Sequence, residues 1–163
     1  MSWLKDNVDP KLVEYLFRIR ITDIPNIGVY QHNVADDLAL DFEQLELQLE
    51  QVPEQIAFWN MLHAEQKSKV EILDRRIKTI RGQVTERLLK EARDSKIELR
   101  SNDLKEILNC DKGVLELDAQ LLAQKKVLDK LDVVVDGFIR KFDALRSLAG
   151  FKKEDKRVHG QGS

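Results

Sequence analysis

The side chains best suited to chemistry in this sequence are four cations that fall within seven residues of one another. They belong to the stretch DRRIKTIRG (residues 74–82), in which isoleucines at helical spacing separate Arg75, Arg76, Lys78 and Arg81. Guanidinium and ammonium groups bind phosphate oxygens through charge-assisted hydrogen bonds. We therefore predict that this basic cluster binds the backbone of nucleic acid, with three further cations on the same helix: Lys67, Lys69 and Arg87.

Charge is distributed unevenly along the chain. Residues 67–100 hold 11 Lys and Arg against 6 Asp and Glu, whereas residues 1–60 hold 4 against 11. The formal net charge of −2 therefore combines a basic segment with an acidic N-terminal third. The alternative interpretation is a solvated helix face stabilised by local ion pairs at i,i+4, namely Glu71–Arg75, Asp74–Lys78 and Glu86–Lys90. The sequence leaves both interpretations open.

No arrangement typical of an active site or a metal centre is found in the sequence. It contains neither a GxxxxGK(S/T) phosphate loop nor a GxGxxG turn, and the histidines His32, His63 and His159 are scattered. His63 falls on an apolar helix face, and the pair Asp36–Asp37 fits the start of a helix better than a metal site. We expect a protein that is not an enzyme and that uses no metal and no cofactor.

Cysteine usage and hydropathy indicate the compartment. A single cysteine, Cys110, excludes an intramolecular disulfide and favours a reducing environment, and we expect it to be a buried or half-buried apolar residue. No apolar run approaches the roughly 18 residues of a membrane span. The N-terminal MSWLKDNVDP lacks the apolar core of a signal peptide. We expect a cytoplasmic protein with no membrane partner.

The elements that position the basic cluster begin with an N-terminal arm. Asp9 and Pro10 have the residue types of an N-cap and a first helical position, which predicts a short helix over residues 11–19. Residues 21–33 contain Pro25 and Gly28 and have no helical period, so they are expected to form a loop or extended arm. Four apolar side chains there are expected to dock on the rest of the protein: Phe17, Ile19, Ile21 and Ile24.

A long helix is predicted to carry the basic cluster. Asp41 and Gln44 resemble a capping box, which indicates a helix over residues 42–51. After a kink or brief break, Pro53 becomes the first residue of a long helix that reaches about residue 92. The apolar seam of these helices alternates spacings of four and three through Leu38, Phe42, Leu45, Leu49, Val52, Ile56, Trp59 and on to Leu88.

A second long helix is predicted after a short one. Ser101 or Asn102 caps a short helix over residues 103–109, and Asp111 caps a long helix that runs to a C-cap at Gly150. Two long helices joined by a short connection are expected to fold back on each other. The fold class is therefore all-α, a coiled-coil-like hairpin with short accessory helices. The expected organisation is an arm (1–40), a hairpin core (41–149) and a flexible basic tail (150–163).

The second long helix has more apolar residues than one seam requires. Val127, Val134 and Leu148 precede the seam, and Ile139 lies on its other flank. A pair of helices would leave these side chains exposed, so we predict a homo-oligomer built on this helix. The expected oligomerisation residues are Val127, Val134, Phe138, Ile139, Phe142, Leu145 and Leu148. Gln124, the polar residue of the seam, either fixes the register or reaches solvent.

Two stretches carry a family resemblance: residues 41–59, from Asp41 through Leu45 to Trp59, and the run LKEILNCDKGVL (residues 104–115), continuing to Leu121. In these the chain resembles the UvsY recombination mediator proteins of T-even-type bacteriophages, over residues 40–150. The resemblance implies a helical protein in a closed ring, roughly a hexamer to heptamer, within the host-cell cytoplasm. It also implies binding of single-stranded DNA near the end of the first long helix, at the basic cluster.

The same resemblance implies two protein partners, a phage recombinase and a single-strand-binding protein. The mediator would help to load the recombinase onto DNA strands that the single-strand-binding protein coats. RRIKTIR keeps the charge of the family's basic and aromatic DNA motif but lacks its aromatic residues. Two functional hypotheses follow. The first is a recombination mediator that binds single-stranded DNA through backbone electrostatics. The alternative is an oligomeric helical scaffold or chaperone-like adaptor without nucleic-acid binding.

Overall fold

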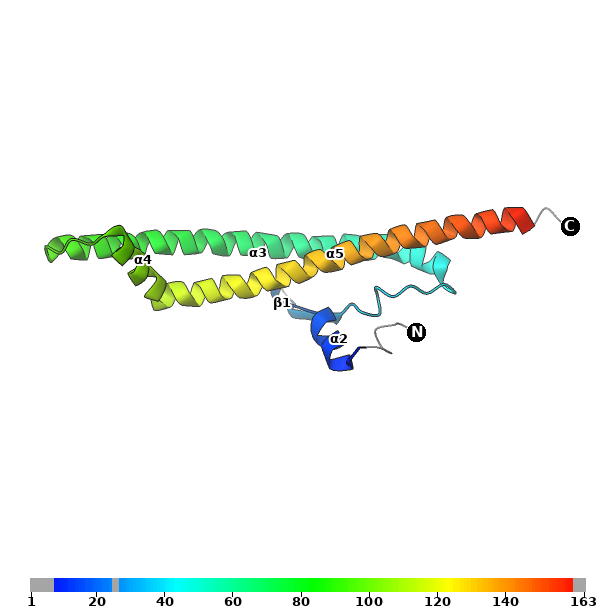
Figure 1. Cartoon of the computed structure of the whole chain (residues 1–163), viewed down its shortest axis with the longest axis horizontal. Helices are drawn as coiled ribbons and strands as arrows, with labels where there is room; N and C mark the ends of the chain where they lie inside the picture. The colour runs from blue at the N-terminus through cyan, green and yellow to red at the C-terminus, as the bar shows by residue number, and fades with distance from the viewer. Residues whose placement is uncertain (1–7, 25–26, 160–163) are drawn as a thin grey trace. The chain divides into compact units, whose positions relative to one another are not determined.

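The computed structural model describes residues 8–24 and 27–159, and these residues are mostly helical. In chain order the elements are α2 (Pro10–Phe17), β1 (Arg18–Ile24), β2 (Gly28–Asn33), α3 (Leu45–Asp94), α4 (Ser101–Cys110) and α5 (Lys112–His159) (Figure 1). The expected pair of long packed helices is confirmed, with α3 and α5 as its members. The two-stranded sheet was not expected.

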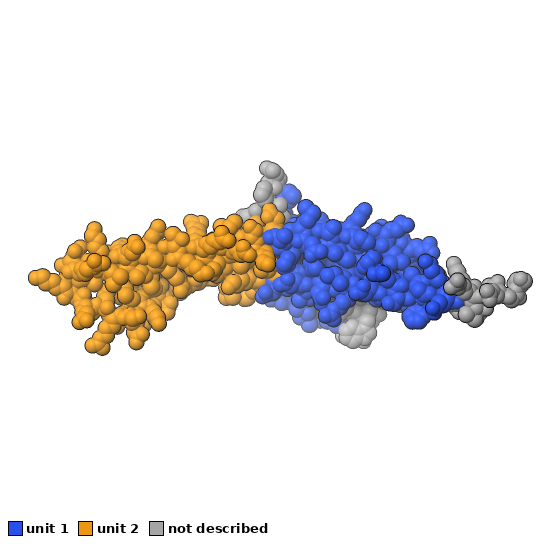
Figure 2. All heavy atoms as spheres, turned by 90° about the horizontal axis from the view of Figure 1, so that it is seen from above, with its two compact units in different colours: residues 1–64, 129–163 blue, residues 65–128 orange. Residues whose placement is uncertain are grey.

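The chain divides into two compact units, which Figure 2 distinguishes by colour. Unit 1 comprises residues 1–64 and 129–163, and unit 2 comprises residues 65–128. Each unit contains one segment of α3 packed on one segment of α5. In unit 1 the rings of Trp59 and Phe138 stack with their centroids 6.2 Å apart. In unit 2 the amide nitrogen of Gln66 donates to Gln124 Oε1 at 2.7 Å.

Heptad spacing in the sequence correctly identified the buried seam of both long helices. In unit 1, α3 buries every seventh residue at Leu45, Val52 and Trp59, and α5 buries Leu131, Phe138 and Leu145 at the same interval. In unit 2 the buried seam residues include Val70, Ile77 and Val114. Full burial of such side chains contributes about 1.5–3 kcal/mol each, so this seam is the main source of helix stability.

Pro53 lies inside α3, so the prediction of a separate helix that starts at Pro53 is wrong. A proline in a helix interior removes one backbone hydrogen bond and costs about 3 kcal/mol. Leu45, Val52 and Trp59 all lie on the buried face, and they keep a common phase only if the helix continues through Pro53. The burial of this face outweighs the cost of the proline, whose own side chain is exposed.

The capping box predicted at Asp41 does not start a helix. Asp41 Oδ1 accepts from the amide of Glu43 at 2.9 Å, which closes a turn, and α3 begins only at Leu45. Phe42, expected in the seam, therefore precedes the helix and is 66% exposed. The side chain of Gln48 holds this turn instead, because its Oε1 accepts from the Asp41 amide at 3.1 Å.

Other predicted helix ends are close to those observed. Asp9 Oδ1 accepts from the Lys11 amide at 2.8 Å, and Asp111 Oδ1 accepts from the Val114 amide at 3.0 Å, so both predicted N-caps are confirmed. The short helix α4 starts at Ser101, with Arg100 rather than Ser101 or Asn102 at the N-cap. Cys110 ends this helix and is exposed, which corrects the expectation of a buried thiol, since α4 buries none of its residues.

The C-terminal end of α5 differs from the prediction. Gly150 does not cap the helix, which continues to His159, so residues 150–159 are helical rather than a flexible tail. One exposed glycine costs about 1 kcal/mol relative to alanine, which is too little to end a helix that good helix formers continue. The last four residues of the predicted tail, 160–163, lie outside the described residues.

The segment predicted as a loop or extended arm forms an antiparallel β-hairpin. Arg18 pairs with Asn33, and Ile21 pairs with Tyr30, before a bulge that follows Ile21. Pro25 and Asn26, between the two strands in sequence, lie outside the described residues. The alternation in RIRI places Ile19 and Ile21 on one face, where they are 1% and 3% exposed, so their expected docking is confirmed.

The N-terminal segment packs against α5 within unit 1. The ammonium of Lys130 donates to the carbonyl of Tyr15 at 3.1 Å, near the end of α2. Eleven residues further along α5, Lys141 donates to the carbonyl of Asp37 at 2.6 Å. Between them, a Cβ added at Gly137 would lie 3.1 Å from Leu38 Cδ2, so a larger residue would require the Leu38 side chain to shift by a few tenths of an ångström. Tyr15, Asp37 and Leu38 of the N-terminal segment therefore lie along one stripe of α5.

Candidate nucleic-acid interface

The basic cluster lies on the part of α3 that belongs to unit 2. Ile77 is 5% exposed and Ile80 is half-buried, and together they fix the rotation of the helix about its axis. This rotation directs the cluster outward: the side chain of Arg75 is 79% exposed, that of Lys78 is 74% exposed, and Arg76 is also exposed. Of the flanking cations, Lys67 and Arg87 are exposed, and Lys69 is half-buried.

Two of the three predicted local ion pairs form. Lys78 Nζ lies 2.6 Å from Asp74 Oδ2, and the hydrogen bond from Lys78 is the main reason that the pKa of Asp74 is lowered. Arg75 Nη2 lies 3.9 Å from Glu71 Oε2, a looser contact. The third predicted pair, Glu86 with Lys90, is not among the ion pairs of the described residues. Exposed ion pairs of this kind contribute little to stability, so they open easily for another anion.

Arg81 differs from the rest of the cluster because its partner comes from the other long helix. Its Nη2 lies 2.6 Å from Asp118 Oδ2 of α5, and the two side chains are 41% and 39% exposed. Nε of Arg81 is buried and has no hydrogen-bond partner within the described part of the chain. Arg87 is paired more loosely, with Nε 3.9 Å from Glu91 and Nη2 3.9 Å from Asp111.

Charge and aromatic residues are separated between the two units. Unit 2 holds 15 Lys and Arg against 12 Asp and Glu, a net charge of +3, whereas unit 1 holds 12 against 17, a net charge of −5. Every Phe, Trp and Tyr of the sequence lies in unit 1. The basic surface therefore offers charge and hydrogen-bond donors to a nucleic acid but no ring on which a base can stack.

Most of the predicted oligomerisation residues are not available at the surface of the chain. Val134, Phe138 and Leu145 are 4%, 0% and 1% exposed, and Val127, Phe142 and Leu148 are half-buried. Ile139, at 43%, is the exposed member of the set. The expectation that Val134 stays exposed on a pair of helices is wrong: Val134 lies on the stripe of α5 between Lys130 and Lys141, which contact the carbonyls of Tyr15 and Asp37.

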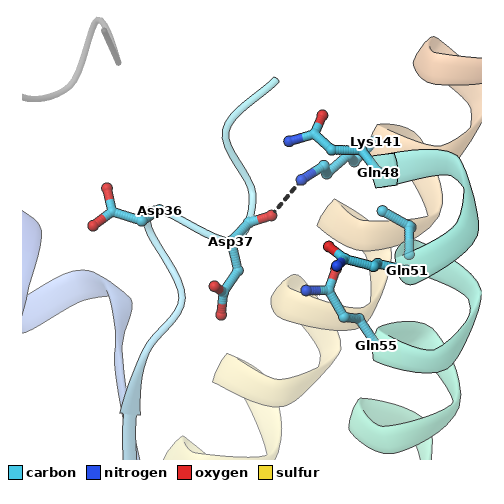
Figure 3. Close-up of a pocket in the computed structure, with 7 residues that line it drawn as sticks. Asp36, Asp37, Gln48, Gln51, Gln55 and Lys141 are labelled. Atoms are coloured by element: carbon cyan, nitrogen blue, oxygen red, sulfur yellow. Dashed lines mark hydrogen bonds between the residues drawn. The ribbon is translucent and has the colours of Figure 1, made fainter. Parts of the chain in front are cut away.

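A polar pocket of about 150 Å³ lies within unit 1 (Figure 3). Its lining residues are Asp36, Asp37, Gln48, Gln51, Val52, Gln55 and Lys141. Figure 3 shows that Asp37 directs its carbonyl oxygen toward the ammonium of Lys141. Burial lowers the pKa of Lys141, and the negative charge of Asp37 partly opposes that shift. Because Lys141 and Gln48 both bond to backbone of residues 37–41, these two pocket residues anchor the connection between β2 and α3.

The histidines and acidic residues considered for metal binding take part in pairs. Nε2 of His63 lies 2.7 Å from Asp132 Oδ1, and Nε2 of His32 lies 2.5 Å from Asp37 Oδ2. Asp36 and Asp37 occupy a turn between β2 and α3, so their expected place at a helix start is wrong. Within residues 8–24 and 27–159, no group of three or more His, Cys, Asp or Glu is arranged to hold a metal ion.

The sequence analysis missed two charged residues, namely Asp118, the partner of Arg81, and Lys141 of unit 1. Asp118 directly follows Leu117 of the second seam, and Arg81 directly follows Ile80 of the first, so both flank the packed faces. Opposite charges at such flanking positions commonly pair across two helices, and this rule would have found the contact. Lys141 shares its heptad position with Val134 and Leu148, which was a signal that it is buried.

Comparison of the chain with protein families, curated proteins and solved structures finds no match. Any function proposed for unit 2 therefore has to be argued from its own residues and geometry. In the part of the chain that the structure describes, no helix combines the length and the apolar character needed to cross a bilayer.

Proposed function

We propose that this protein binds the backbone of single-stranded DNA through the basic cluster of unit 2 and acts, without enzymatic activity, as a recombination mediator. The main support is the outward display of Arg75, Arg76 and Lys78 on a unit of net positive charge within an acidic chain. Loading of a recombinase onto strands coated by single-strand-binding protein is the part of the proposal that rests on the resemblance to the UvsY proteins.

Electrostatics favours a phosphate backbone over the acids that now contact the cluster. The pairs with Asp74 and Glu71 join side chains of one helix that solvent and salt screen, so they hold the cations weakly. A strand presents several phosphates at once, and each neutralised phosphate releases condensed counterions, which adds a favourable entropy. A multiply charged strand therefore displaces these local acids at low salt.

The proposal includes self-association, because one chain offers too few contacts for tight binding. Without aromatic rings in unit 2, stacking cannot add the roughly 1–3 kcal/mol per base found in other single-strand-binding proteins. Several basic clusters in one assembly, such as the ring implied by the resemblance, multiply the effective concentration of cations along a strand. We place the contacts between chains at apolar residues of α5 that remain exposed: Leu115, Leu122, Val133 and Ile139.

The test measures fluorescence anisotropy of a labelled oligo-dT strand over a range of salt concentrations. Replacing Arg75, Arg76, Lys78 and Arg81 by alanine should weaken binding and flatten the slope of log K against log salt by up to about 3, at 0.7 per phosphate contact. A matched control replaces four exposed cations of unit 1 by alanine, namely Lys11, Arg20, Arg140 and Lys152. Equal losses in both variants would show that net charge, and not the basic cluster, binds the strand.

The second candidate function is an oligomeric helical scaffold or adaptor without nucleic-acid binding. It is favoured by the ion pairs that already engage Arg81 and Arg87 and by the absence of aromatic residues from unit 2. Retention on a single-stranded DNA resin at low salt separates the two candidates, because a scaffold with a neutralised surface would flow through.

A further inference from the structure

Among the cations of the basic cluster, Arg81 is held by a carboxylate that has no evident structural role of its own. Among the described residues, the side chain of Asp118 pairs with Arg81, whose Nη2 lies 2.6 Å from Asp118 Oδ2. By contrast, Asp111, which approaches Arg87, also caps α5 by accepting from the Val114 amide. Asp118 is therefore the acid near the cluster whose charge can be removed with little effect on the fold.

The geometry of this pair makes it a stronger competitor than the local pairs of α3. The side chain of Arg81 is 41% exposed, whereas those of Arg75 and Lys78 are 79% and 74% exposed, so solvent screens the attraction of Arg81 for its acid less. The contact at 2.6 Å already engages Nη2 of Arg81 with Asp118 Oδ2, and Nε of the same guanidinium is buried. A phosphate that approaches Arg81 therefore meets a carboxylate already bound to it.

We propose that Asp118 is an internal competitor of nucleic-acid phosphate for Arg81, so that this carboxylate lowers the affinity of the basic cluster and limits the number of its phosphate contacts. The inference rests on the proposed backbone binding by unit 2. It assigns a regulatory role to a residue of α5, outside the helix that carries the cluster. Neutralising this one carboxylate should then convert Arg81 from an occupied cation into an available one.

The experiment uses the full chain and the same oligo-dT anisotropy assay. Asp118→Asn should bind about threefold tighter at low salt and steepen the salt slope by about 0.7, the value for one additional phosphate contact. Glu116→Gln is the matched control, because Glu116 is an exposed acid on the same helix turn and makes no ion pair with the described residues. Glu116→Gln changes the net charge by the same amount as Asp118→Asn. The smaller increase in affinity expected for Glu116→Gln therefore measures the effect of net charge alone.

Two further variants test the role of Arg81. Asp118→Glu keeps a carboxylate at this position and should bind like the wild type. In an Arg81→Ala background, Asp118→Asn should give no more than the gain produced by Glu116→Gln, because the cation it would release is absent. Circular dichroism of each variant checks that the helices are intact, and Asp118→Ser repeats the test if the asparagine variant loses helix.

The possible results distinguish this inference from the proposal on which it rests. Equal gains from Asp118→Asn and Glu116→Gln, with salt-sensitive binding by the wild type, would overturn the role of Asp118 and leave backbone binding in place. An absence of salt-sensitive binding in the wild type and in Asp118→Asn alike would overturn both. A threefold gain that requires Arg81 supports the competition.

Discussion

Pro53 offers the sharpest test of the helix arrangement that positions the basic cluster. It is the ninth residue of the 50-residue helix α3, and its side chain is exposed. A proline at this position leaves the carbonyl of Leu49 without its helical donor and places the ring against that carbonyl. Pro53→Ala restores the backbone N–H and removes the clash, and an exposed alanine loses little packing.

The size of the effect follows from two opposing contributions. Proline is about 3 kcal/mol less favourable than alanine in a helix interior. Proline also restricts the unfolded chain, and this restriction stabilises the folded protein by about 0.4–1 kcal/mol that the alanine variant loses. The free energy of unfolding should therefore rise by about 2 kcal/mol. For a chain of this size, at about 2–4 °C per kcal/mol, Tm should increase by roughly 4–8 °C.

The assay is thermal and urea unfolding followed by far-UV circular dichroism. The control is Pro10→Ala, because Pro10 is the first residue of α2, where the missing N–H has no helical partner to lose. That variant should show no gain in stability. If Pro53→Ala also shows no gain, or is less stable than the wild type, Pro53 begins a separate helix and the continuous α3 is refuted.

Three further changes test other features of the fold. Val134→Lys should lower the free energy of unfolding by about 3 kcal/mol or more in urea titrations, because it buries an unpaired charge, whereas Val133→Lys, at a side chain 71% exposed, should be nearly neutral. Lys96 has φ 54° where α3 ends, so Lys96→Gly should raise stability by about 1 kcal/mol and Lys96→Ala should not, as thermal unfolding can show. Because burial lowers the pKa of Lys141 below 10.5, the folded chain binds fewer protons than the unfolded chain between that lowered pKa and 10.5. Stability should then rise with pH across this window, and urea midpoints at stepped pH should show that Lys141→Met removes the rise.

The long helices were predictable because their signal is local and repeated. Each seam residue recurs every three or four positions, so an error at one position, such as Phe42, leaves the phase of the others intact. Caps were predictable where one side chain bonds to its own turn, as Asp9 and Asp111 do. Pro53 and Gly150 were misjudged because their local preferences act against helix but are smaller than the gain from a continuous packed face.

The N-terminal segment could not be placed from the sequence because its contacts lie far along the chain. Lys130 meets the carbonyl of Tyr15, and Lys141 meets that of Asp37, across more than 100 residues in each case. The alternation in residues 18–21 was a strand signal, yet a two-stranded hairpin is marginal alone and forms here with Ile19 and Ile21 buried. The second long helix does have more apolar residues than one seam requires, but other residues of the same chain cover some of them.

At the candidate site, the sequence predicted where the cations lie but not which acids they pair with. Counting charges locates the basic cluster, because cations concentrated on one helix segment remain concentrated in any fold that keeps the helix. Counting does not show which cations are available, since Arg81 and Arg75 look alike in the sequence but meet acids of different origin. An acid on the same helix moves with its cation and yields to a strand at small cost, whereas Asp118 is held on α5 by the packing of the two helices. If the basic cluster binds a phosphate backbone as we propose, its affinity depends on α5, which carries none of the predicted DNA-binding residues, as well as on the helix that displays the cluster.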